Sequence, residues 1–479
     1  MMKHPEWKAL LTEVRRKDLT PNKKKSTQFP LLKRFSKSRT ESERDYDRIL
    51  FSTPVRRLSD KTQVFPLEKN DSVRTRLTHS HEVANIARSM GVALVSDSDI
   101  FKGVPKANRN VPAILAAVGL AHDIGNPPFG HEGELAIAKW FSDHTSDVFC
   151  DDCSEQMKLD YENFEGNAQA LRILSKLQIV NDDFGLNLTC ASLAALVKYP
   201  CASDKRVSDD SDIAKKKFGY FYSEKTMCKE VWEQTGLNEG IRHPLAYIME
   251  AADDIAYSVL DAEDAIKKGL VSYRDLIDHI KDDADESIKF VVEKSEDNHK
   301  KYLNEDLHPT ELNDISMQMF RVNAVGELVA AATRAFEDNI EDILLGKFKT
   351  DLIKVSDAAN LCKKLKNFSY KHAYKSRKVL ELELDGYKVI HKIMDMLWAA
   401  IEQRGNPLND DTHGGDIFER YAYGLISENY RRIFEDKNNN HPISYKRSQL
   451  LADMVSGMTD SFAIEFEQNL TSFKLSDKK

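Results

Sequence analysis

The sequence has few cysteines and no long apolar run. Six Cys among 479 residues are too few for a disulfide scaffold. Cys150 and Cys153 form one CxxC pair, but no second pair stands at zinc-finger spacing, so we interpret all six as reduced thiols. The opening MMKHPEWKALLTEVRRKD lacks the apolar stretch of a signal peptide, and no run of about 18 apolar residues could span a membrane. We therefore expect a cytoplasmic protein with no membrane partner.

An excess of positive charge is also lacking. The chain carries 69 Lys and Arg against 77 Asp and Glu, a formal net charge of −8. The whole molecule therefore offers no polycationic field for nucleic acid, and any site for a polyanion must be built from local basic residues. Hydrophobic residues make up 41% of the chain and charged residues 30%, as in an ordinary folded globular protein.

Alternating strand patterns are scarce, and only FGYFYS at 218–223 is typical of a short strand or hairpin edge. Most other segments have helical periodicity, which predicts an all-α fold. We divide the chain into a basic N-terminal arm (1–43), a helical core (44–270) and a C-terminal helical region (271–479). The Lys-, Arg- and Ser-rich stretch 15–44 is either a solvated tail or an arm that contacts phosphates or nucleic acid.

Two expected helices carry histidines at the edge of an apolar face. In Arg74–Met90, His79 falls on the apolar stripe and His81 on the polar one, so His79 should point inward, as a core residue or as a ligand. The helix that follows Val111, with Pro112 in its first turn, should end in adjacent His122 and Asp123, with Gly125 as its C-cap. At a helix terminus both side chains can reach one ion.

The helix after the loop NPPFG should begin near His131 and carry Glu134 on the same face. An imidazole backed by a carboxylate suits an acid–base or nucleophilic histidine. A simple helix-start capping arrangement is the alternative interpretation.

A third helix, Leu245–Ala265, places Asp253 at the border of a clear apolar face and Asp254 on the wetter side. An aspartate beside a core stripe costs free energy unless it is paired or bound to a cation. Tyr257 lies one turn further on. Mixed imidazole and carboxylate ligands suit Mn, Fe, Ni or Zn and tolerate Mg. The candidate metal ligands are His79, His122, Asp123 and Asp253.

Amide and ammonium groups that could hold phosphates occur in a fourth set of segments. These are Asn163–Gln169, Lys198–Tyr199 and the lysines Lys215, Lys216 and Lys217. Solvated surface lysines are the alternative interpretation.

Longer strings make the pattern specific. They are VRRLSDKTQVFPLE (55–68), SVRTRLTHS (72–80), AHDIGNPPFGHEGE (121–134), NFEGNAQ (163–169), YIMEAADDIAY (247–257) and SGMTDSFA (456–463). With the order THS…HD…D, they resemble bacterial deoxyguanosinetriphosphate triphosphohydrolases, the dGTPase branch of the HD phosphohydrolase superfamily. The resemblance covers about 44–270 and returns at 444–470. Little of the segment between 271 and 440 matches the family. The resemblance therefore does not assign the residues for base selection or allosteric control.

The resemblance implies an all-α HD core and metal-dependent hydrolysis of dGTP, with other dNTPs as further candidates, to deoxynucleoside and intact triphosphate. It assigns the four candidate ligands to a divalent ion, Mg or Mn first and Fe, Ni, Co or Zn as alternatives. His131 and Glu134 become the catalytic pair beside the α-phosphate, with His131 as general acid or nucleophile. The resemblance implies that Gln63 and Val64 line the deoxyribose pocket and that Tyr257 lies near the sugar. The other implied substrate-binding residues are Asn167, Lys198, Tyr199 and Lys217 at the phosphates, and Arg447.

The resemblance also implies a homo-oligomer, tetrameric or hexameric, and an effector that is either single-stranded DNA or a dNTP. Two other functions stay open at this point. One is another HD phosphohydrolase, a broad dNTPase or a 5′-nucleotidase; the other is a nucleic-acid-binding regulatory protein with an inactive HD core.

Overall fold

A computed structural model describes residues 5–20, 38–67, 70–178, 182–207, 211–375, 377–405 and 416–476. Across these ranges the chain is helical, with one isolated bridge between Arg15 and Thr189 and no strand, which confirms the all-α prediction. Most of the basic stretch 15–44, residues 21–37, lies outside the described residues. Arg15 itself is buried, with its Nη1 2.8 Å from Asp45 Oδ1.

The expected strand at 218–223 is wrong. This segment is irregular and ends in a short 3-10 turn at Tyr222–Glu224. Phe218, Tyr220 and Phe221 are fully buried, so the apolar pattern reflects packing into the core. The backbone N–H of Tyr222 donates to a buried carboxylate, Asp160, at 2.6 Å, which replaces the ladder partner that a strand would need.

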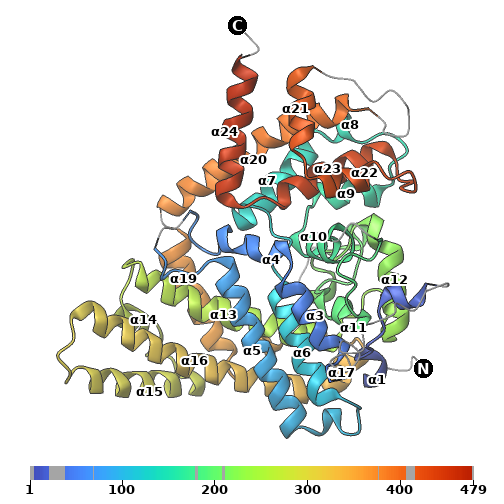
Figure 1. The fold of residues 1–479 in the computed structure, drawn as a ribbon. Helices are drawn as coiled ribbons and strands as arrows, with labels where there is room; N and C mark the ends of the chain where they lie inside the picture. The colour runs from blue at the N-terminus through green and yellow to red at the C-terminus, as the bar shows by residue number, and fades with distance from the viewer. Residues whose placement is uncertain are drawn as a thin grey trace.

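The core is built around three long helices, α5, α6 and α13, which pack on one another (Figure 1). Its helices are α1 (Trp7–Leu10), α3 (Glu41–Leu50), α4 (Thr53–Arg57), α5 (Arg76–Asp97), α6 (Ala107–Ala121), α7 (Gly130–Asp143), α8 (Thr145–Val148), α9 (Glu155–Glu162), α10 (Gly166–Arg172), α11 (Cys190–Leu196), α12 (Lys225–Thr235) and α13 (Pro244–Lys267). Helix α13 begins at Pro244, where the fixed φ and missing N–H of proline suit a first turn.

The remaining helices lie on two sides of this core (Figure 1). Helices α16 to α19 pack against α13, and α14 and α15 pack on α16 and α19. On the other side α20 packs on α7 and α23 packs on α9 and α10, while α21 and α24 pack on α20. They are α14 (Tyr273–Ile280), α15 (Glu286–Tyr302), α16 (Pro309–Asp338), α17 (Ile340–Leu344), α18 (Leu352–Val355), α19 (Ala359–Ser369), α20 (Arg377–Gln403), α21 (Ile417–Leu425), α22 (Glu428–Phe434), α23 (Ile443–Ser456) and α24 (Asp460–Ser476). None of the helices in the described ranges combines the length and apolar character that crossing a bilayer requires.

Candidate active site

Helix α5 presents His79 to the interior. Its N-terminus is fixed by Thr75, whose side chain accepts a hydrogen bond from Thr78 N. His79 is 1% exposed, whereas His81 lies on the solvent side, as the helical periodicity predicts. His79 Nε2 lies 3.2 Å from Asp253 Oδ1 on α13.

Helix α6 ends in the His–Asp pair, but its boundaries differ from the prediction. It begins at Ala107, so Pro112 lies inside it, and it ends at Ala121 with His122 as the C-cap. Gly125 is therefore not the C-cap. A Cβ at Gly125 would come 2.0 Å from the carbonyl oxygen of Gly166, so the glycine allows this loop to approach α10.

The structure brings the four candidate ligands together. Ligand atoms of His79, His122 and Asp123 all lie within 4.8 Å of one another. Asp253 Oδ1 is 3.4 Å from His122 Nε2 as well as close to His79. His122 Nδ1 donates to the carbonyl of Gly119 at 2.7 Å, which directs Nε2 toward the carboxylates. This buried Nε2 has no hydrogen-bond partner among the described residues, as expected of an atom that ligates a metal.

Electrostatics at this cluster fit a cation. Burial lowers the pKa of His122, but Asp123 and Asp253 more than offset this and raise it to about 10. Two basic side chains contact the carboxylates of the cluster: Arg76 Nη1 lies 2.5 Å from Asp123 Oδ2, and Lys198 Nζ lies 2.8 Å from Asp253 Oδ2. Although burial acts to raise the pKa of Asp253, Lys198 and His122 hold it well below its usual range. Two carboxylates are thus kept ionised beside two imidazoles.

His131 and Glu134 form a hydrogen-bonded pair on the first turns of α7. His131 Nδ1 lies 3.1 Å from Glu134 Oε2, and the N–H of Gly166 donates to Glu134 Oε1 at 2.8 Å. The bond to Glu134 raises the pKa of His131 above its ordinary value. The Glu134 side chain is largely buried, while that of His131 is 69% exposed and so accessible to a ligand.

Gly166 joins this pair to the ligand cluster. A Cβ at Gly166 would lie 2.4 Å from Asn126 Oδ1 and 2.6 Å from Glu134 Oε1. Asn126 Nδ2 in turn donates to Asp123 Oδ1 at 2.8 Å. The carboxylate cluster and the His131–Glu134 pair are therefore in adjoining positions, and only glycine fits between them.

Of the three candidate lysines, Lys217 faces the His131–Glu134 pair. Its Nζ lies 2.8 Å from Glu165 Oε2 and 4.0 Å from Glu134 Oε2. Burial alone would lower the pKa of Lys217, but these two glutamates raise it above the ordinary lysine value. Asn167 Nδ2 donates to Glu165 at 2.5 Å. The ring of Tyr199 is half-buried and lies 5.4 Å from the Arg242 guanidinium.

The four other predicted substrate residues come from three separate segments of the chain. Val64 is buried, and Gln63 Oε1 is buried without a hydrogen-bond partner among the described residues. Tyr257 stacks on Tyr374, with ring centroids 6.0 Å apart. Arg447 on α23 donates to the carbonyl of Glu402 at 3.3 Å, and no hydrogen bond or ion pair among the described residues joins it to the four candidate ligands.

Sequence reasoning missed several residues that complete the site. Arg76 and Asn126 hold Asp123, and Tyr374 covers Tyr257. Arg76 and Asn126 stand inside the strings SVRTRLTHS and AHDIGNPPFGHEGE, so their nearness to His79 and Asp123 was a usable signal. Tyr374 lies in the unmatched region between 271 and 440, where the sequence contains no signal that this residue belongs to the site.

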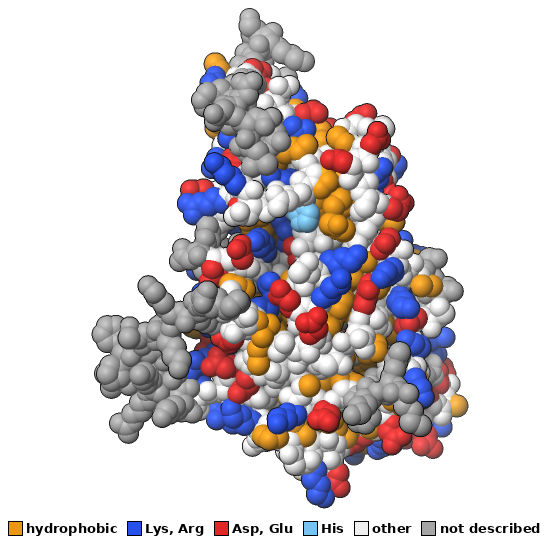
Figure 2. Space-filling model, turned by 90° about the vertical axis from the view of Figure 1, so that its right-hand side faces the viewer, with side chains coloured by type: hydrophobic (Ala, Val, Ile, Leu, Met, Phe, Trp, Pro, Cys, Tyr) orange, Lys and Arg blue, Asp and Glu red, His pale blue; other side chains and the backbone are white. Residues whose placement is uncertain are grey.

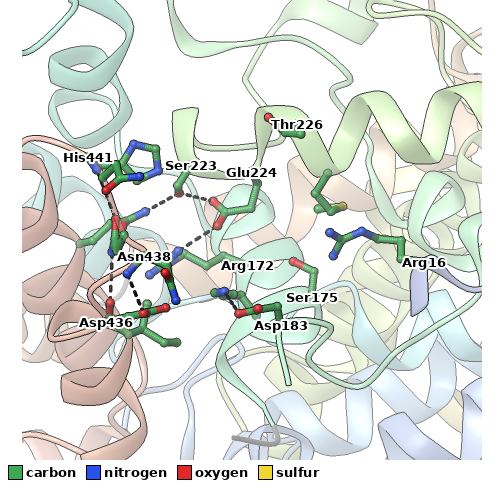
Figure 3. Close-up of a pocket in the computed structure, with 16 residues that line it drawn as sticks. Arg16, Arg172, Ser175, Asp183, Ser223, Glu224, Thr226, Asp436, Asn438 and His441 are labelled. Atoms are coloured by element: carbon green, nitrogen blue, oxygen red, sulfur yellow. Dashed lines mark hydrogen bonds and ion pairs between the residues drawn. The ribbon is translucent and has the colours of Figure 1, made fainter. Parts of the chain in front are cut away.

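A separate pocket of about 450 Å³ lies away from the cluster, and none of the candidate ligands lines it (Figure 3). It opens between the core and the α22–α23 connection. Four of its charged side chains pair with one another: Arg172 with Glu224 at 2.8 Å, and Lys176 with Asp183 at 2.6 Å. The pocket is therefore distinct from the site assembled above.

Comparison with known proteins agrees with this geometry. Residues 76–181, which include His79, His122 and Asp123, match the HD domain family. The fold and the cluster thus define an HD-domain protein. A deoxyguanosinetriphosphate triphosphohydrolase-like protein of Listeria monocytogenes is 36% identical over 97% of this chain and 99% of its own length.

Two further relatives cover most of the chain. One, from Synechocystis sp., carries the same description and is 34% identical over 98% of this chain and 100% of its own length. A Yersinia pestis protein described as deoxyguanosinetriphosphate triphosphohydrolase is 33% identical over 88% of this chain and 92% of its own length. The chain belongs to the deoxyguanosinetriphosphate triphosphohydrolase family of HD-domain proteins, which confirms the resemblance found in its motifs.

Proposed function

We propose that this protein hydrolyses deoxynucleoside triphosphates in a metal-dependent reaction, with dGTP as first substrate and with deoxyguanosine and triphosphate as products. The observation that carries the proposal is the adjacency of two sites. An imidazole–carboxylate cluster suited to a divalent ion adjoins the His131–Glu134 pair, with Lys217 4.0 Å from Glu134.

His79, His122, Asp123 and Asp253 would hold the ion, Mg or Mn first. When bound, it would polarise an α-phosphate oxygen and supply an activated water. Lys198 and Lys217 would neutralise phosphate charge, with Asn167 as an amide donor, so that triphosphate leaves as a stabilised anion. Tyr257, backed by Tyr374, would form an aromatic wall for the deoxyribose.

His131 would act on the leaving or bridging oxygen, or on the phosphorus itself. Glu134 accepts the Nδ1 hydrogen bond and orients the ring, which leaves Nε2 available to a substrate. The exposure of His131 beside largely buried Glu134 supports this division of roles.

Product analysis tests the reaction. The four dNTPs are supplied singly and in pairs to metal-loaded protein, and products are identified by chromatography. Release of triphosphate from dGTP supports the proposal. Orthophosphate alone would instead indicate another type of HD phosphohydrolase. Faster turnover in mixtures than with single dNTPs would reveal activation by a second nucleotide.

Two adjacent aspartates offer a matched test of the metal site. Asp253 faces His79 and His122, whereas Asp254 pairs with Lys366 at 2.6 Å. We expect Asp253→Ala to reduce bound metal at least about tenfold, because it removes one of the four proposed protein ligands. Asp254→Ala should keep metal content near wild type. Equal metal loss in both variants, measured by mass spectrometry of dialysed protein, would contradict the assignment.

Assembly and effectors are part of the proposal. We infer a homo-oligomer, tetrameric or hexameric, with single-stranded DNA or a dNTP as effector and a cytoplasmic location. Mass photometry of the full chain measures the assembly. The regulatory alternative is tested with metal-depleted protein to which Mn or Mg is then restored. DNA binding without any dNTP hydrolysis in that sample would favour the regulatory alternative.

A further inference from the structure

Asp460, the first residue of α24, is a buried carboxylate that contacts two separate loops of the core. Its Oδ2 accepts hydrogen bonds from the backbone N–H of Thr62 at 2.9 Å and from the Thr62 hydroxyl. Its Oδ1 accepts from the backbone N–H of Phe129 at 2.9 Å. One side chain from the C-terminal region therefore holds segments that are 331 and 398 residues away in sequence.

Both loops lead directly to proposed active-site residues. Thr62 precedes Gln63 and Val64, the residues predicted for the deoxyribose pocket. The carbonyl of Thr62 accepts from Arg76 Nε at 3.0 Å, and the other end of the same guanidinium holds the ligand Asp123. The Thr62 loop is thus tied to the metal cluster as well as to Asp460.

Phe129 is the N-cap of α7, and His131 follows two residues later. Its φ of +61° is uncommon for a residue with a side chain, so the loop does not adopt this conformation without support. The hydrogen bond from Phe129 N to Asp460 supplies that support at the residue that begins the catalytic helix. The position of His131 therefore depends on this contact.

Lys61 makes a second link between the same parts. Its buried Nζ donates to the carbonyl of Asn126 and, at 2.8 Å, to the carbonyl of Ser456 at the end of α23. Breaking the Asp460 contacts should consequently shift the two loops locally and leave the fold attached, because Lys61 still joins them to the α23–α24 junction.

We propose that Asp460 is a positioning residue, which sets the separation between the deoxyribose-pocket loop and His131. The inference rests on the function proposed above. The α23–α24 junction lies outside the residues that match the HD domain family. In this proposal it aligns the substrate pocket with the helix that carries His131.

The test uses Asp460→Asn in the full chain. An amide has one carbonyl oxygen, so it can keep the bonds at Thr62 or the bond at Phe129, but not both. We expect kcat for dGTP to fall at least about tenfold, as a displacement of catalytic groups predicts, with metal content unchanged. Ser461→Ala is the matched control, because the Ser461 hydroxyl donates an exposed hydrogen bond to Asp60 at 2.9 Å; its kcat should stay within twofold of wild type.

Thr62→Val separates the two halves of the contact. It removes the hydroxyl donor and keeps the Thr62 backbone bond and the Phe129 bond, so KM should rise several-fold while kcat changes less than twofold. A general loss of stability would lower the fraction of active enzyme in both variants. It would not raise KM in one variant and lower kcat in the other. Thr62→Val also tests the proposal if Asp460→Asn fails to fold.

Hydrogen exchange gives a readout that does not depend on activity. In Asp460→Asn, amides in peptides covering 126–131 or 61–66 should exchange faster than in wild type, and Ser461→Ala should match wild type. If wild type cleaves no dNTP, the proposed reaction fails and exchange alone decides the positioning role. Unchanged exchange, or kcat equal to that of Ser461→Ala, would overturn the inference.

Discussion

His131 and Glu134 form a pair whose protonation decides which step the imidazole can serve. The hydrogen bond to Glu134 favours the charged imidazolium and raises its pKa. A general acid must be protonated, whereas a nucleophile must be neutral. The two roles that the sequence left open therefore predict different pH–rate profiles. Titration of His131 gives the alkaline limb if it is a general acid and the acidic limb if it is a nucleophile.

Glu134→Gln distinguishes these roles. Loss of the carboxylate charge should lower the pKa of His131, whose proton Glu134 stabilises. If His131 is the general acid, the alkaline fall in kcat moves to lower pH. If it is the nucleophile, the acidic limb moves to lower pH. A profile from pH 5 to 10 in Mn-loaded enzyme measures both limbs, and His131→Ala serves as the control that removes the titrating group while metal content is kept.

At the scale of a single element, α13 positions Asp253 and depends on its first turn. His243 is the N-cap: its Nδ1 accepts from Leu245 N at 3.1 Å, and its Nε2 donates to the carbonyl of Leu10 at 2.9 Å. The bond accepted at Nδ1 requires the neutral ring, because a protonated Nδ1 has no lone pair to offer Leu245 N. Burial lowers the pKa of His243 to about 4 from an ordinary value of 6.5.

This capping histidine predicts an acid-dependent loss of stability. Below pH 6.5 the unfolded chain binds a proton that folded His243 excludes, so stability falls as the pH drops toward about 4. Between pH 7 and 5 the contribution is roughly 2 kcal/mol. The gap in unfolding free energy between wild type and His243→Asn, measured by urea denaturation, should narrow by about this amount. The exposed His81→Asn should show no such change, and a constant gap for His243→Asn would refute the prediction.

At the scale of the whole molecule, the C-terminal helices are fastened to the core by a buried ion-pair network. Arg172 at the end of α10 pairs with Glu224 at 2.8 Å and with Asp453 of α23 at 2.7 Å. All three side chains are at most 6% exposed, so each charge depends on its partners. The surface, by contrast, carries mixed basic and acidic side chains on the face drawn in Figure 2, in keeping with the net charge of −8.

Arg172→Met should therefore destabilise the protein by about 3–5 kcal/mol, because two buried carboxylates lose their counter-ion. Arg334→Met provides the control. Its partner Asp357 lies 2.9 Å away, but both side chains are about two-thirds exposed, so the change should cost less than about 1 kcal/mol. Denaturant unfolding measures both variants. Similar losses in the two would mean that the network contributes no more than a surface pair.

The sequence by itself determined the helical class, the inward face of His79, the helix that begins next to His131, and the residues that meet in the imidazole–carboxylate cluster. Periodicity and motif order carry this information, because a helix places its side chains by spacing alone. It missed the N-terminal extension of α6 past Pro112 and the true role of Gly125. It also misread 218–223 as a strand, since burial of aromatic rings and strand pairing give the same local pattern.

Only the tertiary structure decided which distant residues hold that cluster in place. These contacts join residues that are far apart along the chain. Arg76 and Lys198 contact the carboxylates, Tyr374 stacks on Tyr257, and Asp460 bonds to two loops. No spacing rule links such residues. Their meeting depends on how the helices pack, and packing is a property of the whole chain.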